Sequence, residues 1–140
     1  MVDARIFGPA FAMVALTAVV MARMLFERTR QMRAGRIHFR DIPSGSQMAA
    51  RFADTRAADN YRNLFEMPVL FYLALVVAAI AGLVTPLSLG LAWAYVALRV
   101  VHSAIHCGYN RVMHRFYAFL ASNLVLWALW AWLGWRLLGA

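Results

Sequence analysis

A row of polar and titratable side chains interrupts an otherwise apolar stretch of the chain, YVALRVVHSAIHCGYNRVMHR at residues 95–115. The row consists of Tyr95, Arg99, His102, His106 and Tyr109, which are spaced four, three, four and three residues apart. At about 3.6 residues per turn, this spacing places all five side chains on one face of a helix. An arginine inside a membrane helix costs at least about 2.5 kcal/mol on insertion scales, so it faces protein or a water-filled cavity. The row therefore predicts a polar site between helices.

A second polar cluster lies in RAADNYRNLFEMP, residues 56–68, and supplies groups that complement the first. Its members fall close to one helix face, four, three and three residues apart: Arg56, Asn60, Asn63 and Glu66. The helix carrying them and the next helix run antiparallel, so we expect Glu66 and Arg99 at a similar depth. Two interpretations stay open. Either the cluster fixes helix packing, with Glu66 paired to Arg99 and the other groups hydrogen-bonded between helices, or it forms a polar pocket for an anionic, peptide-like ligand that opens to the cytoplasm.

The two buried-face histidines also have a spacing that can bind metal or haem. His102 and His106 are four residues apart, but the next histidine in the chain, His114, lies eight residues beyond His106 and no Cys-x-x-Cys motif accompanies them. We therefore predict no metal site and interpret the two imidazoles as a hydrogen-bonding pair. The single cysteine, Cys107, excludes an intrachain disulfide and is interpreted as a structural thiol.

The composition predicts the framework that positions these clusters. The chain has 140 residues, of which 64% are hydrophobic, and a mean hydropathy of +0.63. Four apolar segments are long enough to span a ~30 Å hydrocarbon core as helices, which satisfy their own backbone hydrogen bonds. We predict one all-α domain over residues 1–140, an integral membrane four-helix bundle. The helices are expected at about 6–26, 47–84 (membrane part 67–84), 86–108 and 116–138, with cytoplasmic loops at 27–60 and 108–115.

Two prolines refine this expectation. Pro68 is expected to kink the second helix, because it removes a backbone hydrogen bond. Thr85 is expected to cap the third helix, with Pro86 at its first position.

The distribution of charge predicts the orientation. The formal net charge is +8, and all fourteen basic residues are arginines. Nine of them lie between Arg23 and Arg62, whereas the loop at 82–90 has none. Positive-inside bias therefore predicts that both arginine-bearing loops are cytoplasmic and both termini are outside. Topology and anionic lipid headgroups explain the basic charge, so we expect a lipid bilayer and no nucleic acid as partner.

At these residues the chain resembles the MAPEG family, the membrane-associated proteins of eicosanoid and glutathione metabolism. The resemblance rests on Asn63-x-x-Glu66 with Pro68 shortly after it, on Arg99, and on the segments NLFEMPVLFY and LRVVHSAIHCGYNRVMHRF, which look like a bacterial branch of the family. It implies a homotrimer of left-handed four-helix bundles in a bacterial inner membrane. Glutathione would bind between neighbouring subunits at the cytoplasmic side, contacting Asn63, Glu66 and Arg99.

The chain departs from the family pattern at four positions. Asp59 stands where glutathione-using members have an arginine, and His102 and His106 stand where they have tyrosines. Met113 stands where the best-known members have the arginine that activates the thiol.

The remaining candidate site residues follow from the two polar clusters. Arg56, Asn60 and His102 are assigned to the same glutathione site as Asn63, Glu66 and Arg99. A cation near a thiol lowers the pKa of that thiol, and Arg111, Arg115 or a protonated His106 could supply it. Tyr109 could donate a hydrogen bond to the thiolate. We therefore predict His106, Arg111 and Tyr109 as catalytic residues.

Two functions from different classes follow. The first is a membrane-bound enzyme of the glutathione transferase or peroxidase type, which uses glutathione or a similar thiol on a lipophilic substrate. The second is a non-catalytic membrane protein, or an accessory subunit of a larger membrane complex, that keeps the fold. The retained Asn63, Glu66 and Arg99 favour the enzyme, and the four substituted positions favour the alternative.

Overall fold

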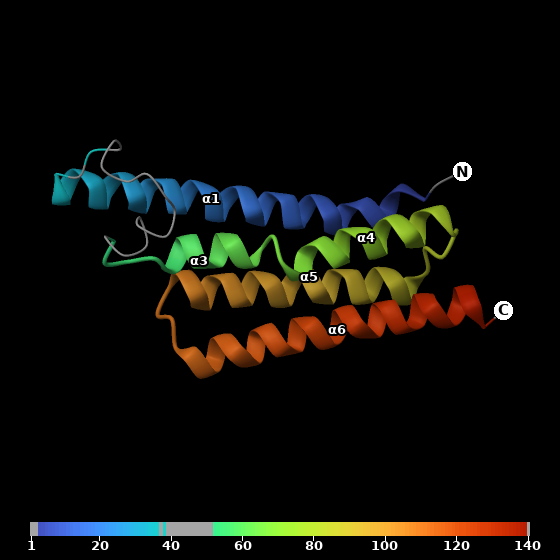
Figure 1. Cartoon of the computed structure of the whole chain (residues 1–140). Coiled ribbons are helices and arrows are strands. Elements are labelled where there is room, and N and C mark those ends of the chain that lie inside the picture. The colour runs from blue at the N-terminus through green and yellow to red at the C-terminus, as the bar shows by residue number, and fades with distance from the viewer. Residues whose placement is uncertain (1–2, 37, 39–51, 140) are drawn as a thin grey trace.

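The described part of the chain is all-helical. The structure, a computed structural model, describes residues 3–36, 38 and 52–139. Figure 1 shows the long helices side by side, with α3 and α4 following one another along one row and both chain ends at the same end of the bundle. The elements are η1 (Ala4–Ile6), α1 (Phe7–Gly35), α3 (Arg56–Asn63), α4 (Met67–Ile80), α5 (Pro86–Cys107) and α6 (Val112–Leu138).

Within the described part of the chain, four stretches are long and apolar enough to cross a membrane, as the sequence predicts. They are Ala4–Gly35, Arg56–Ile80, Pro86–Cys107 and Val112–Leu138. Large apolar side chains point outward from the bundle, among them Phe11 and Ile80, which are 74% and 80% exposed. Such a surface suits lipid. The predicted four-helix fold class is therefore confirmed.

The first helix is longer than predicted. It was expected to end at residue 26, but α1 continues to Gly35. Its last turns are rich in arginine, which favours helix, and an ion pair of 2.8 Å joins Arg30 to Glu27 one turn before it. Arg36 then ends the helix with a left-handed backbone, φ 52°. The arginine-bearing segment from residue 27 to Gly35 is therefore helical and not a loop.

The second helix is broken where a kink was predicted. Residues 52–55 are not helical, α3 begins at Arg56, and a turn at 64–66 separates it from α4; residues 47–51 lie outside the described part of the chain. Pro68 has no N–H to donate, and its ring would clash with the carbonyl of Leu64 in a continuous helix. Glu66 absorbs the change with φ −93° and ψ −93°. The break leaves the Asn63 and Glu66 side chains at the end of one helix and the start of the next.

The second span also ends earlier than residue 84, and the turn that ends it is well defined. Gly82 has φ 67°, and the amides of Gly82 and Leu83 bond to the carbonyls of Ala79 and Ala78. This pattern is a Schellman motif, in which glycine takes the left-handed position.

The third helix then begins as predicted. The Thr85 and Ser88 side chains form a reciprocal capping box, and Pro86 follows directly. The prediction that Thr85 caps the helix is confirmed.

The last two helices are joined by a shorter link than predicted. The link was expected at 108–115, but α5 ends at Cys107 and α6 already begins at Val112. The Arg115 amide bonds to the Arg111 carbonyl at 3.0 Å, which closes the first turn of α6. The sequence from Val112 to Arg115 has no helix breaker, so the helix extends toward the link.

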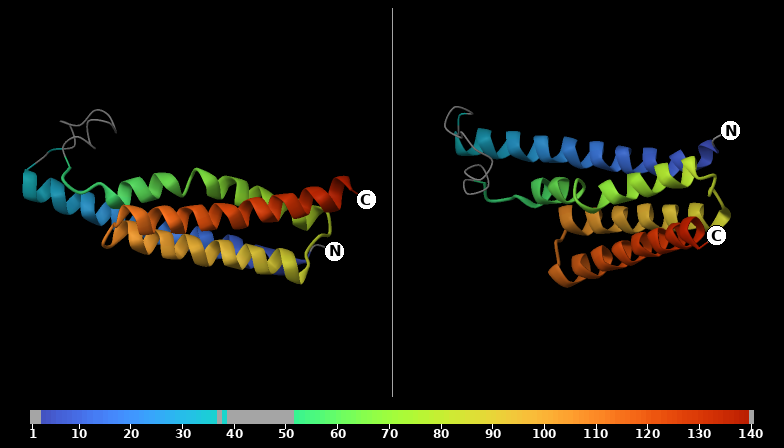
Figure 2. Two further views of the ribbon diagram at one scale, coloured as in Figure 1. Left: turned by 90° about the horizontal axis from the view of Figure 1, so that it is seen from below. Right: turned by 45° about the vertical axis from the view of Figure 1, so that its right-hand side comes forward.

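Small and aromatic side chains fill the middle of the bundle. Ala74, Ala78 and Ala92 are fully buried, and Phe71 stacks on Tyr95 with 4.4 Å between ring centroids. Small residues let helix backbones approach closely, which matters in lipid because the hydrophobic effect does not drive helices together there. Both views in Figure 2 show α5 running alongside α6 over its length. This packing sets the rotation of α5 and α6 about their own axes, and therefore which of their side chains face α3.

Gly108 is a position where a single methyl group should matter. A Cβ at Gly108 would lie 2.7 Å from the backbone oxygen of Ala104, so the end of α5 must shift. We expect Gly108→Ala to lower the free energy of unfolding by about 1–3 kcal/mol, as overpacking does. Thermal unfolding in detergent tests this.

The control for Gly108→Ala is Gly90→Ala, inside the helix that Gly108 follows. A Cβ at Gly90 meets nothing within 4 Å, so alanine there should stabilise the helix by up to about 1 kcal/mol. Equal changes in the free energy of unfolding for the two substitutions would show that the close approach of Gly108 to Ala104 does not limit which residue can stand there.

Candidate functional site

A pocket of about 330 Å³ lies where α3 meets α5 and α6, and it gathers residues from both predicted polar clusters. We call it the α3–α6 pocket. Its walls combine carboxylates, guanidinium groups, imidazoles and aromatic rings: Asp59, Arg62, Asn63, Glu66, His102, His106, Val112, Arg115, Phe116 and Phe119. The volume falls in the range of small-molecule sites.

Arg99 lies behind this pocket and is tied to it through Asn63. The side chain is 0% exposed, and its Nη2 donates to Asn63 Oδ1 at 2.6 Å and to the Asn63 backbone oxygen at 3.2 Å. Asn63 Nδ2 in turn donates to Glu66 Oε2 at 3.1 Å. The packing interpretation expected Glu66 to pair directly with Arg99, but the Asn63 amide bridges the guanidinium and the carboxylate instead. The break at 64–66 brings Asn63 and Glu66 into this position.

The buried guanidinium of Arg99 has hydrogen-bond donors that are not used. Among the described residues Arg99 makes no ion pair, and its Nε and Nη1 have no hydrogen-bond partner. Its Cζ lies 5.9 Å from the centroid of the Phe119 ring, within range of a cation–π interaction. Arg99 does not line the α3–α6 pocket. Its contacts therefore define it first as the residue that orients Asn63.

The two histidines line the pocket together and contact one arginine. His102 Nδ1 lies 3.2 Å from the Arg115 backbone oxygen, and His106 Nε2 lies 3.2 Å from Arg115 Nη1. A carbonyl only accepts and a guanidinium only donates, so these contacts assign the proton to Nδ1 in both rings. Arg115 Nη1 also donates to Asn110 Oδ1 at 2.9 Å. This contact holds the guanidinium beside His106.

Two predicted binding residues lie on another side of α3. Asn60 is 0% exposed, donates to Cys107 Sγ at 3.4 Å, and accepts from Ser103 Oγ at 3.4 Å. Arg56 donates to the backbone oxygen of Gly108 at the end of α5. Both residues hold α3 against α5 and do not line the α3–α6 pocket.

Two of the predicted catalytic residues also lie outside the pocket lining. Tyr109 is 62% exposed, and its hydroxyl lies 3.1 Å from Nδ1 of His114. Arg111 is exposed and directly precedes α6. The third predicted catalytic residue, His106, lines the pocket.

Several lining residues were not among the predicted site residues, and on α3 these are Asp59 and Arg62, which join the predicted Asn63 and Glu66. Asp59, Arg62, Asn63 and Glu66 follow a spacing of three, one and three residues, which is one helix face. That pattern was available from the sequence and describes the pocket wall better than the predicted face through Arg56 and Asn60. Phe116 and Phe119 follow the same spacing at the start of α6, but their orientation depends on how α6 is rotated.

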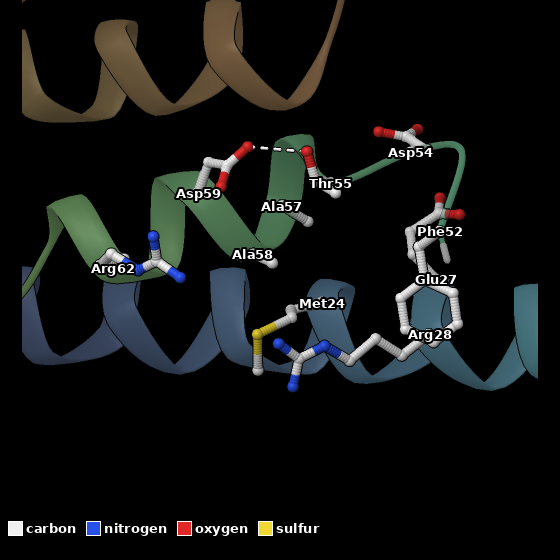
Figure 3. Close-up of a pocket in the computed structure, with 10 residues that line it drawn as sticks. All are labelled: Met24, Glu27, Arg28, Phe52, Asp54, Thr55, Ala57, Ala58, Asp59 and Arg62. Atoms are coloured by element: carbon white, nitrogen blue, oxygen red, sulfur yellow. Dashed lines mark hydrogen bonds between the residues drawn. The ribbon is translucent and has the colours of Figure 1, made fainter. Parts of the chain in front are cut away.

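A second, much smaller cavity lies where the start of α3 meets α1. It measures about 30 Å³, close to the space of one water molecule, and Figure 3 shows its lining. The Gln31 side chain holds the backbone of Asp54, donating to its oxygen at 2.8 Å and accepting from its amide at 3.0 Å. Arg23 Nη2 donates to the Cys107 oxygen at 2.7 Å. These contacts form a structural link that joins α1 to the residues just before α3 and to the end of α5.

The Asp54 carboxylate in this link should make stability depend on acid. Hydrogen bonds from Arg56 lower the pKa of Asp54 to about 2. The stabilisation is therefore complete above the pKa of an unfolded aspartate, about 4, and is lost as the pH falls toward 2. We expect the melting temperature to fall between pH 5 and pH 2.5 by less in Asp54→Asn than in the unmodified protein. An identical fall in both would contradict this role.

No three His, Cys, Asp or Glu side chains within the described ranges are close enough together to hold a metal ion. The site therefore consists of hydrogen-bonding, charged and aromatic groups.

The fold and the site define a four-span membrane protein with a polar pocket at the junction of three helices. The MAPEG family model matches residues 6–135, which is most of the chain. The protein belongs to the MAPEG family, and it is a multi-pass integral membrane protein in a lipid bilayer. No curated protein and no solved structure matches the chain.

Proposed function

We propose that this protein is a membrane enzyme that binds glutathione or a similar thiol in the α3–α6 pocket and reacts it with a lipophilic substrate. The observation that carries the proposal is the make-up of that pocket. Polar groups from α3 and α5 form one part of its lining, and Val112, Phe116 and Phe119 supply an apolar part. A thiol peptide needs the first kind of surface and a lipophilic electrophile or hydroperoxide needs the second.

The chemistry that we propose is activation of the thiol by Arg115. A guanidinium beside the sulfur favours the thiolate, which is the reactive form. Arg115 lines the pocket and makes no ion pair among the described residues, so its charge is available to a ligand. His106 Nε2 lies 3.2 Å from Arg115 Nη1 and helps to hold the guanidinium in place. The thiol gives its proton to water, the thiolate sulfur forms a bond to the electrophilic carbon, and the leaving group departs with the electron pair of the bond that breaks.

The test is ligand-induced stabilisation of the purified protein. Thermal unfolding in detergent is followed with rising glutathione for the unmodified protein and for Glu66→Gln, which keeps the bond from Asn63 but removes the charge. A ligand present at a hundred times its Kd stabilises by about 2.7 kcal/mol. We expect a dose-dependent rise in Tm that is weaker in the variant. No rise at millimolar glutathione would overturn the proposal.

A non-catalytic role has one observation in its favour. Arg99, Asn60 and Ser103 are buried and bonded within the chain, so part of the polar cluster acts in helix packing. Under this alternative the protein is an accessory membrane subunit, and purification in mild detergent would recover it with a different protein.

The assembly that we propose is a homotrimer in a bacterial inner membrane, with the arginine-rich side of the bundle in the cytoplasm. The nine arginines between Arg23 and Arg62 support this orientation, and the family supports the trimer. Native mass spectrometry and cysteine labelling from either side of the membrane test the two points separately.

A further inference from the structure

The last third of α1 carries a surface that the α3–α6 pocket does not use. A hollow of about 440 Å³ lies on this helix, and its lining residues in the described part of the chain are Leu25, Phe26, Thr29, Arg30 and Arg33. We call it the outer α1 face. None of these residues lines the α3–α6 pocket. A ligand on this face therefore occupies a different site from the proposed thiol.

The outer α1 face combines apolar and basic side chains in a fixed order along the helix. Phe26, Arg30 and Arg33 are spaced four and three residues apart, which places them on one side of the helix. Leu25 and Phe26 are 51% and 67% exposed, and the Arg30 side chain is 63% exposed. Exposed apolar surface therefore comes first along the helix, and guanidinium groups follow about one turn later.

The length of α1 places this change of character at the boundary of the membrane. Its 29 residues extend for about 43 Å, which is more than the ~30 Å of the hydrocarbon core. Phe26 is the last residue before a charged stretch, because residues 27–36 contain four arginines and one glutamate. Arg30 and Arg33 lie about 6 and 10 Å beyond Phe26 along the helix axis, where the headgroup region adjoins the hydrocarbon. The apolar part of the face thus meets acyl chains, and the two guanidinium groups meet phosphates.

The hydrogen-bonding groups of the outer α1 face suit a phosphate. The Thr29 hydroxyl donates to the Leu25 carbonyl at 2.8 Å, so the arginines supply the donors for a ligand. Arg30 contacts Glu27 through Nη2 at 2.8 Å, which engages one nitrogen of its guanidinium. A guanidinium carries five N–H donors in a planar fork that matches phosphate oxygens. Two such groups on one face favour an anion, and the neighbouring apolar side chains favour an anion that is attached to acyl chains.

We infer that the outer α1 face binds an anionic phospholipid, with the phosphate between Arg30 and Arg33 and an acyl chain against Leu25 and Phe26. A zwitterionic phospholipid binds less tightly, because the arginines repel the cation of its headgroup. A soluble phosphate ester binds less tightly as well, because it lacks the apolar contact. The face thereby selects lipids of net negative charge from the surrounding bilayer.

The experiment measures which lipid the purified protein binds first. Native mass spectrometry in detergent follows binding from an equimolar mixture of phosphatidylglycerol and phosphatidylcholine with the same acyl chains. We expect phosphatidylglycerol to be preferred. Each arginine beside an anionic headgroup contributes about fivefold to binding, so the preference should fall by about 20- to 30-fold in the variant that combines Arg30→Gln with Arg33→Gln.

Three controls locate the effect. Arg5→Gln combined with Arg136→Gln removes the same charge from the opposite end of the bundle and should keep the preference. Leu25→Ala combined with Phe26→Ala should weaken the binding of both lipids and leave their ratio unchanged. Glycerol 3-phosphate, which has the phosphate but no acyl chain, should not displace the lipid at equal concentration.

Four results would overturn the lipid site. Equal binding of the two lipids by the unmodified protein is the first, and an unchanged preference in the variant of Arg30 and Arg33 is the second. An equal loss of preference in the opposite-end variant is the third, because net charge alone would then explain it. The fourth is displacement by glycerol 3-phosphate, which would assign the face to a soluble phosphate. A changed number of subunits without a change in bound lipid would likewise replace the lipid by a second copy of the chain.

Discussion

Replacing Asn63 by alanine should lower the free energy of unfolding by about 2–4 kcal/mol, the largest stability effect that we expect from a polar substitution in this protein. The reason is the buried guanidinium of Arg99, which has its shortest contact, 2.6 Å, with Asn63 Oδ1. The alanine variant leaves a buried charge with only the backbone oxygen of residue 63 as a partner. Unfolding in detergent by heat or by a denaturing detergent measures the loss.

A second substitution separates this cause from a general disturbance of α3. Adding Arg99→Leu to Asn63→Ala removes the unpaired charge, so the double variant should be more stable than Asn63→Ala alone. Arg62→Ala, an exposed neighbour on the same helix, should change stability by less than about 0.5 kcal/mol. An Asn63→Ala variant as stable as the unmodified protein would show that the link between Asn63 and Arg99 contributes nothing.

Replacing Arg115 by glutamine should lower kcat/KM for conjugation of glutathione to a lipophilic electrophile by about 10²-fold, as loss of one charge-stabilising donor does in other enzymes. Glutamine keeps a donor for Asn110 but carries no charge to stabilise the thiolate. The ultraviolet absorbance of the bound thiolate, titrated against pH, should show a higher thiol pKa in the variant. This second readout would not respond to a merely structural role.

Two further arginine variants sharpen the result. Arg136→Gln, at the opposite end of α6, is the matched control and should keep the activity. Arg111→Gln tests the other cation that the sequence offered for activation of the thiol. Since Arg111 is exposed and does not line the pocket, we expect a much smaller loss than in Arg115→Gln. A larger loss of activity in Arg111→Gln than in Arg115→Gln would show that Arg111 activates the thiol.

The features that the sequence predicted well depend on local chemistry. The cap at Thr85, with Pro86 after it, follows from the preferences of the first helical turn, and the four spans follow from apolar length. The expectation that Glu66 and Arg99 lie at a similar depth followed from the antiparallel course of two helices joined by a short loop, and in the structure Asn63 connects the two residues. The sequence also showed that Pro68 disturbs the second span.

The features that could not be predicted from the sequence depend on contacts between segments that are far apart in the chain. A proline in a helix can cause a kink or a full break. Which of the two occurs depends on the contacts that neighbouring side chains and backbone groups make when the helix is interrupted. Here Asn63 binds Arg99 and Glu66, which favours the break. The rotation of α6 is likewise set by its packing along α5, so neither Phe116 nor Phe119 could be assigned to the pocket from spacing alone. Arg56 and Asn60 lie on another side of α3 than the pocket, which spacing alone did not show because four- and three-residue steps describe two adjacent faces nearly equally well.

The bond between Arg99 and Asn63 also bears on how the chain enters the membrane. Asn63 precedes Arg99 by 36 residues, so the second span leaves the ribosome before the third. An arginine at the centre of a lone helix raises the cost of insertion by about 2.5–3.5 kcal/mol. Because the acceptor for the guanidinium is synthesised first, the third span can meet its partner as it inserts. The order of the spans along the chain thereby lowers the insertion cost of the most expensive residue in the bundle.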